Sequence, residues 1–229
     1  THLKDHQPCN KYLAINMLIL LNWYARLSPA HGKSTPPYEH VVQIGDPKLR
    51  KVSEPVPFDK IKTNEIQTII KKLEYVINKY GSLGMSAPQI GVNLRIFAMR
   101  HTVKQIASLP REIAALRGME VVPFTVFINP KLKVVDYKKV IHSEGCESVQ
   151  GYLAEVPRYK AVQVTGLNAQ GEESTQVFKD WSARIAQHEM DHLDGKIYTD
   201  IMDRKTLTCS CWEEVNMSKG KLVIPFSPQ

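Results

Sequence analysis

The stretch Gln187-His188-Glu189-Met190-Asp191-His192 contains an H-E-x-x-H motif near the end of a segment with helical features. Residues four apart share one face of a helix, so both histidines can reach a single metal ion. Glu189 follows the first histidine, where a carboxylate can act as general base in metal-assisted amide hydrolysis. Asp180 or Ser182 is predicted to cap this helix at its start, and Gly195 to end it.

Catalytic zinc sites usually have three protein ligands, so the two histidines leave one ligand to be found. A metzincin would have a third histidine where this chain has Tyr198. A thermolysin-like peptidase takes a downstream glutamate, for which Glu213 or Glu214 is available. Upstream, Cys146 follows a glycine after a β-prone run, where a bulge could redirect its side chain. A cysteine in such a place is by itself more often buried and inert, so the residues alone leave the third ligand open.

A third segment, Gly84-Met85-Ser86-Ala87-Pro88-Gln89-Ile90-Gly91, contains a proline and two glycines and is predicted to be a loop. With Glu144-Gly145-Cys146-Glu147-Ser148 and the histidine motif, the chain resembles the peptide deformylases. Their signatures are G-x-G-[hydrophobic]-[small]-A-P-Q-[hydrophobic]-G, E-G-C-x-S and Q-H-E-x-D-H, in this order. The resemblance covers residues from about Gln43 to Asp203. Ser82 replaces the first glycine, and Glu147, where bacterial members usually have leucine, resembles the animal mitochondrial branch.

The resemblance implies hydrolytic removal of the formyl group from the N-terminal formylmethionine of a nascent peptide. One divalent ion would be held by Cys146, His188 and His192. The family implies Fe²⁺, while this donor set also suits Zn²⁺, Co²⁺ or Ni²⁺. The Gln89 side chain and the backbone N–H of Glu147 would stabilise the oxyanion.

The peptide substrate is expected to dock as an added strand along Gly84 and Gly145. Glu144 and Ile185 are expected to border the same site. We also predict an ion pair between Glu144 and Arg158 that fixes the Cys146 loop beneath the pocket.

The composition is that of one catalytic domain with an appendage: 229 residues, 43% of them hydrophobic. The four cysteines show no disulfide framework, which favours a reducing compartment. Cys209-x-Cys211 is closer-spaced than the common C-x-x-C motifs, and we treat it as incidental. The net charge of +7 is spread along the chain, which allows a transient ribosome contact but predicts no specific nucleic-acid site. A noncatalytic, metal-stabilised module on the ribosome is the competing hypothesis outside enzymes.

Residues 12–25 are apolar, with basic residues on both sides. Fourteen residues are too few to span a bilayer comfortably, so no stable membrane insertion is expected. The run suits a secretory signal or an organelle transit peptide. A thiolate metal site disfavours secretion, and the family resemblance favours the mitochondrial matrix. We therefore predict a targeting and flexible segment over residues 1–40 and a deformylase catalytic domain over residues 41–229.

Hydrophobic periodicity predicts an amphipathic helix over residues 59–80, ended by Gly81, and a short helix over residues 111–117 within a surface insertion. Residues 168–171 read as a hairpin turn. β-prone runs predict strands at residues 95–99, 125–129, 132–135, 139–142, 161–167 and 175–178. Together these features predict an α+β domain in which antiparallel strands surround one buried helix that carries the H-E-x-x-H motif.

Overall fold

The structure is a computed structural model that describes residues 34–228. The predicted targeting run at residues 12–25 lies outside the described residues, as does Cys9. The strands are β1 (Gly84–Ser86), β2 (Ile96–His101), β3 (Val122–Gly145), β4 (Tyr152–Leu167), β5 (Glu173–Lys179) and β6 (Thr208–Cys209). The helices are α2 (Asn64–Tyr80), α3 (Val103–Ala107), α4 (Arg111–Leu116), α5 (Asp180–Leu193) and α6 (Trp212–Met217).

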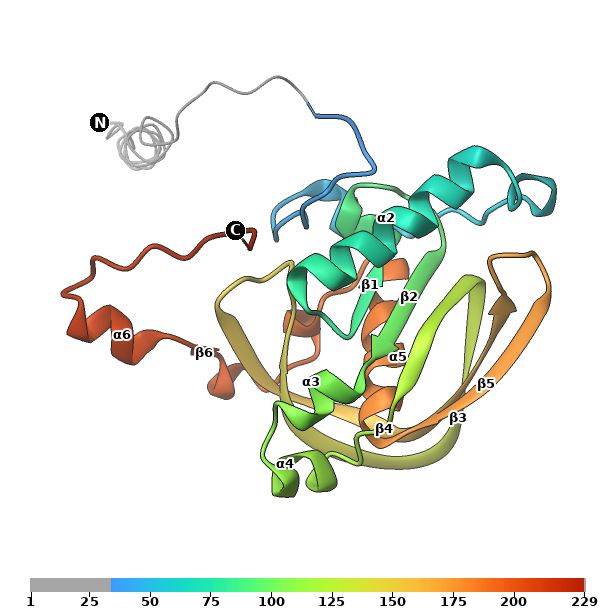
Figure 1. The fold of residues 1–229 in the computed structure, drawn as a ribbon. Coiled ribbons are helices and arrows are strands. Elements are labelled where there is room, and N and C mark those ends of the chain that lie inside the picture. Colours follow the sequence, from blue (N-terminus) through green and yellow to red (C-terminus); the bar gives the residue numbers. More distant parts are fainter. Residues whose placement is uncertain (1–33, 229) are drawn as a thin grey trace, which may run out of the picture. The chain divides into compact units, whose positions relative to one another are not determined.

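The six strands form one antiparallel sheet in the order β1-β2-β3-β4-β5, and β6 pairs with β4 (Figure 1). The predicted α+β class with an antiparallel sheet is confirmed. The hairpin turn predicted between β4 and β5 is also present, since the N–H of Asn168 donates to the carbonyl of Glu172. No helix in the described part of the chain is both long and apolar enough to cross a membrane.

Three predicted strands, at residues 125–129, 132–135 and 139–142, are parts of the single strand β3. Its pairing with β4 shifts register between Ile128 and Lys131, and again on both sides of Asp136. Each irregularity breaks the alternation of apolar and polar side chains that identifies a strand in a sequence. The prediction therefore divided one long strand into three.

Helix α2 packs its apolar face on β1 and β2, as its 3.6-residue periodicity predicts. The helix begins at Asn64 and not at residue 59, because Asp59 belongs to a separate 3-10 turn and Thr63 is the N-cap. Gly81 ends the helix in the left-handed region, with φ +67°. The helix end thus places residues 82–86 at the edge of the sheet.

Helix α5 contains both histidines of the motif and is largely buried. The predicted N-caps are wrong: Lys179 occupies the N-cap position and makes no side-chain cap bond, while Asp180 and Ser182 lie inside the helix. Gly195 follows the C-cap with φ +71°, as expected. A Cβ at Gly195 would lie 2.8 Å from the carbonyl oxygen of Arg50, so the close approach of the chain also requires glycine here.

The Gly84 segment is ordered as strand β1 followed by a 3-10 helix over Ala87–Ile90, so the loop prediction is wrong. Pairing with β2 supplies the strand. Pro88 lies in the first turn of the 3-10 helix, where its missing N–H costs no hydrogen bond. The side chains of Ser86 and Gln89 form a capping box that fixes this turn.

The insertion between β2 and β3 forms α3 and α4, and α4 confirms the predicted short helix to within one residue. At the other end of the chain, α6 follows β6 directly. Residues 222–224, near the end of the described chain, form no strand.

Candidate metal centre

Three donor atoms from two parts of the chain converge at one point. Cys146 follows the last residue of β3, and His188 and His192 lie one turn apart on α5. The Sγ atom of Cys146 lies 3.2 Å from Nε2 of His192, and the two histidine Nε2 atoms lie 3.2 Å apart. Donors held tetrahedrally at ordinary Zn–S and Zn–N bond lengths are about 3.4–3.6 Å apart, so this trio fits one ion.

The direction of the Cys146 side chain is set by the turn that follows the end of β3, and not by a bulge. Gly145 is paired with Leu153 as the last residue of β3, without a register shift there, so the predicted bulge is absent. The turn after it brings the N–H of Ser148 to 3.4 Å from Sγ of Cys146 and that of Val149 to 2.9 Å from the Cys146 carbonyl. These contacts fix the direction of the thiol.

Glu144 orients the imidazole ring of His188. Its carboxylate lies 2.7 Å from Nδ1 of His188, which leaves Nε2 to face the other donors. The predicted ion pair with Arg158 is present at 2.7 Å, and both side chains are 5% exposed. Burial alone raises the pKa of Glu144, but the hydrogen bond to His188 and the charge of Arg158 hold it well below its usual range.

Two members of this charge network were missed from the sequence. Arg184 donates to Glu144 at 2.8 Å and to the carbonyl oxygens of Val156 and Val140. Asp191 pairs with Arg158 from the other side. A signal for Arg184 was available, because it precedes His188 by four residues and so shares its helix face.

Glu189 lies outside the donor trio. Its side chain is 3% exposed, and its Oε2 atom has no hydrogen-bond partner within residues 34–228. Burial raises the pKa of Glu189 to about 7. A Cβ on Gly84 would lie 2.5 Å from Oε1 of Glu189 and 2.7 Å from Cγ2 of Ile185, which explains the glycine at this position.

The pKa values of His188 and His192 are shifted in opposite directions. Burial alone lowers the pKa of His188, but the neighbouring Cys146 and Glu144 raise it well above its ordinary value. Burial and the neighbouring charge of His188 lower the pKa of His192 well below that value. A cation at the donor atoms would favour neutral imidazoles and a thiolate.

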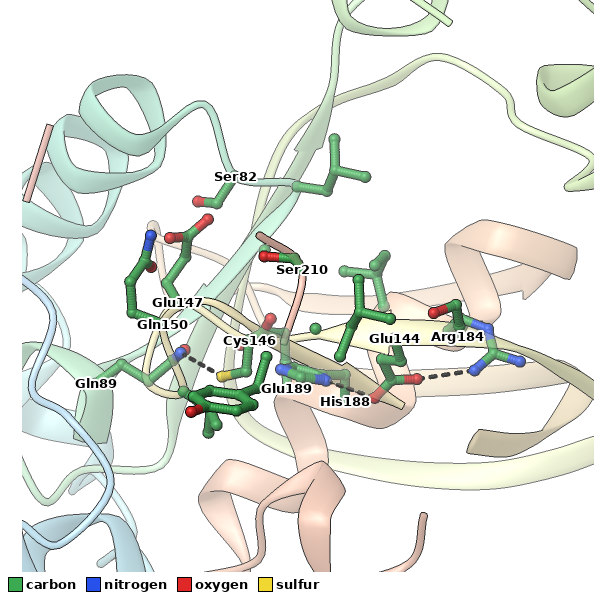
Figure 2. A pocket seen from close by; sticks show the side chains of 18 of the residues that line it. Ser82, Gln89, Glu144, Cys146, Glu147, Gln150, Arg184, His188, Glu189 and Ser210 are labelled. Carbon is green, nitrogen blue, oxygen red and sulfur yellow. Dashed lines mark hydrogen bonds and ion pairs between the residues drawn. The ribbon is translucent and has the colours of Figure 1, made fainter. Parts of the chain in front are cut away.

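Gln89 is buried and its amide has a fixed orientation. Its Oε1 accepts from the N–H and the hydroxyl of Ser86, at 2.9 and 3.0 Å. Its Nε2 donates toward Sγ of Cys146 at 3.5 Å and Oγ of Ser148 at 3.3 Å, so the amide N–H groups point into the site (Figure 2). The backbone N–H of Glu147 makes no hydrogen bond to any described residue. Burial raises the pKa of the Glu147 side chain.

These groups meet in a pocket of about 460 Å³. His192 lies behind its wall and is 1% exposed. The alternative ligands Glu213 and Glu214 are exposed on α6, outside both the pocket lining and the donor trio. The pocket lining includes nine of the predicted site residues: Gly84, Gln89, Glu144, Gly145, Cys146, Glu147, Ile185, His188 and Glu189.

The pocket also contains residues that the sequence did not indicate. Arg117, from the insertion between β2 and β3, stacks its guanidinium 4.3 Å from the centroid of the Trp181 ring. Ser210 enters from the segment between β6 and α6 (Figure 2). Arg117 and Ser210 lie outside the three motifs in sequence, and only the folded chain brings them to the pocket.

Comparison with known proteins identifies the family. A family model described as polypeptide deformylase matches residues 38–207. The mitochondrial peptide deformylase of Homo sapiens is 43% identical over 185 residues, which are 81% of this chain and 76% of the human protein. The chloroplastic peptide deformylase 1A of Solanum lycopersicum is 36% identical over 184 residues, 80% of this chain and 65% of the tomato protein.

A solved structure agrees with these sequence matches. The Met-Ala-Ser-bound class I type b peptide deformylase of Acinetobacter baumannii superposes with a TM-score of 0.63 at 25% identity, over 71% of this chain and 96% of the bacterial one. Since one continuous match spans the Gly84 segment, Cys146 and both histidines, the chain belongs to the polypeptide deformylase family.

Proposed function

We propose that this protein removes the formyl group from the N-terminal formylmethionine of newly made polypeptides in the mitochondrion. The products are formate and a free methionine amine. The observation that carries the proposal is the convergence of Cys146, His188 and His192 at the pocket lined by Glu189, whose Oε2 has no hydrogen-bond partner among residues 34–228. Similarity to the human protein, which is named mitochondrial, supports the compartment.

Cys146, His188 and His192 would hold one divalent ion, with Fe²⁺ as our first choice. One thiolate and two imidazoles also accommodate Zn²⁺, Co²⁺ or Ni²⁺. When bound, such an ion polarises the formyl oxygen and lowers the pKa of the attacking water. Glu144 positions His188 in this scheme. Its oxygens already bond His188 and two arginines, so it borders the substrate site without being free to bind substrate.

Glu189 moves the protons. Its Oε2 accepts a proton from the attacking water, because it is the one buried carboxylate oxygen of the site without a partner in the described chain. The protonated carboxyl then donates that proton to the amine nitrogen as the C–N bond breaks. A pKa near neutrality suits a group that must both accept and return a proton.

Two N–H donors stabilise the formyl oxygen as it gains negative charge. One is Nε2 of Gln89, whose orientation is fixed by the two bonds from Ser86 to its oxygen. The other is the backbone N–H of Glu147, which makes no hydrogen bond within the part of the chain that the structure describes. Because the main chain supplies this second donor, a glutamate side chain in place of leucine changes the pocket wall and leaves the donor intact.

The peptide would dock as an extra strand at the free edge of β1. Gly84 has no side chain that would occupy this edge. A Cβ at Gly145 would lie no closer than 3.4 Å to Tyr152, so the chain's own packing does not require glycine there. We infer that the space beside Gly145 accommodates the substrate backbone. Ile185, half-buried beside Gly84, supplies an apolar wall.

We propose that α5 is the central helix of the domain and is surrounded by the strands. Its buried side chains pack on β2, β4 and β5 in one cluster. We propose residues 1–40 as the targeting segment and residues 41–229 as the catalytic domain. The bond from the N–H of Tyr38 to the carbonyl of Ile90 supports a start of the domain a few residues earlier. A transient ribosome contact, supported by the charge of +7, completes the proposal.

Formate release from formyl-Met-Ala-Ser tests the reaction, with the bound metal measured on the same sample. We expect stoichiometric metal and formate release that depends on the formyl group. A thermolysin-like peptidase would instead cleave an internal bond of a longer unformylated peptide without releasing formate. Bound metal with neither reaction would identify a noncatalytic module and overturn the proposal.

A further inference from the structure

Cys209 and Cys211 form a close thiol pair outside the metal centre. Their sulfur atoms are 3.6 Å apart and hydrogen-bonded, and both residues are half-buried. A disulfide bond is about 2.05 Å long, so the sulfurs need to approach by only about 1.5 Å. Cys209 ends β6 and Cys211 caps α6, which places the pair where the chain turns. The two cysteines, which the sequence spacing alone did not connect, are therefore placed to react with each other.

The residue between the two thiols belongs to the wall of the pocket. Figure 2 shows Ser210 at the pocket. Gly151 and Tyr152 line the same wall. The N–H and the hydroxyl of Ser210 both donate to the carbonyl of Gly151, at 2.8 and 3.1 Å. Cys209 is paired with Tyr152 in the sheet. Any change of backbone shape at the thiol pair is therefore transmitted to three residues that line the pocket.

We propose that Cys209 and Cys211 form a reversible disulfide that reshapes the pocket wall at Ser210. The oxidant is a low-molecular-weight disulfide of the glutathione type. The Cys209 thiolate attacks one of its sulfurs and releases one small thiol. The Cys211 thiolate then attacks the Cys209 sulfur, which forms the internal S–S bond and releases the second small thiol. The protein loses two electrons and two protons, and the small disulfide is reduced to two thiols.

The roles of the two thiols follow from their contact. The hydrogen bond with Cys209 raises the pKa of Cys211, so Cys211 retains its proton more strongly than an ordinary thiol. Cys209 is accordingly assigned the first attack and Cys211 the resolving step. The metal-bound Cys146 thiolate would be shielded from the same oxidant by its ion.

The test is oxidation of the metal-loaded full chain with oxidised glutathione, followed by peptide mapping by mass spectrometry. We expect the peptide containing Cys209 and Cys211 to lose two hydrogen atoms in mass, and dithiothreitol to restore them. In Cys211→Ser the resolving thiol is missing, so Cys209 should accumulate one stable glutathione adduct. Cys209→Ser provides the matched control and should give no internal disulfide.

The second readout rests on the proposed function. The KM for a formylated peptide should rise about threefold or more on oxidation, with the metal content unchanged. A stable glutathione adduct on the unsubstituted chain, a disulfide to Cys146, or no oxidation would overturn the disulfide. A disulfide with unchanged KM would overturn its link to the pocket. Formate release measured before oxidation tests the proposed function separately.

Discussion

We expect Glu189 to have a role separable from metal binding, because its carboxylate lies outside the donor trio. Glu189→Gln preserves the shape of the side chain and removes its ability to accept a proton. We expect one metal ion per chain and a kcat lower by at least about 10², the usual contribution of a general base. Glu173→Gln, the same change at an exposed site on β5, is the matched control and should retain full activity. Near-normal turnover of Glu189→Gln would exclude the role.

We expect Cys146 to be the third metal donor, which the histidine motif does not supply. Cys146→Ser replaces a thiolate with a hydroxyl that remains protonated and binds divalent metals weakly. We expect metal content to fall far below one ion per chain after dialysis, as measured by elemental analysis. The double variant Glu213→Gln/Glu214→Gln should retain its metal, since both side chains are exposed on α6. The reverse pattern would move the third ligand to α6.

His101 makes stability depend on pH at a distance from the metal centre. The residue is fully buried, and burial lowers its pKa from the ordinary 6.5 to about 4. The unfolded chain therefore binds a proton near pH 6.5 that the folded chain binds only near pH 4. This difference does not lower the free energy of unfolding above pH 6.5. The free energy of unfolding then falls as pH falls, and the loss reaches about 3 kcal/mol below pH 4.

His101→Gln should remove this part of the acid sensitivity, as measured by urea unfolding between pH 7 and pH 4. The other titrating groups are common to both proteins, so the comparison isolates His101. Parallel stability curves for His101→Gln and the original chain would place His101 in contact with water.

Among the elements, the β3–β4 hairpin and α5 are joined by buried charges. Arg158 on β4 bonds Glu144 on β3 and Asp191 on α5. Removing one partner of a buried pair costs about 3–5 kcal/mol. We expect Arg158→Ala to lower the free energy of unfolding by about 3 kcal/mol, near the lower end of this range. The loss is smaller because Arg184 and His188 still bond Glu144.

Denaturant unfolding of Arg158→Ala gives this measurement. Arg50→Ala removes the more exposed ion pair with Asp200 and provides the control. That change should cost less than about 1 kcal/mol. Equal losses in the two variants would mean that the network around Glu144 contributes no more than a surface pair.

Elements with an unbroken pattern could be predicted from the sequence. The apolar face of α2 repeats through the helix, whereas the register shifts in β3 hide its length. The start of α5 could not be predicted, because no side chain caps it. The two histidines of the proposed metal site could be predicted from helical spacing, but Cys146 was added to them only through family resemblance. Arg117 and Ser210 depend on long-range packing, which no local pattern encodes.

For the whole molecule, catalysis is expected to depend on the chain from about residue 35 onward. Deletion of residues 1–34 should leave the melting temperature, the metal content and the formate-release rate unchanged. Deletion of residues 1–41 should lower the melting temperature, because it removes Tyr38, which packs on Gly91, and the buried Val41. Precipitation of the shorter deletion would show that the N-terminal residues belong to the fold.

A metal ion at the donor trio would also join two distant parts of the chain. Cys146 and His192 are 46 residues apart in sequence and lie on a turn and a helix. An ion bound to both acts as a cross-link, and closing a loop of this size with a covalent bond contributes about 4 kcal/mol in chain-entropy terms. A molecule without the proposed ion would therefore lack this cross-link as well as a complete active site. We expect metal-free copies to be cleaved by a protease more readily within residues 147–191 than metal-loaded ones.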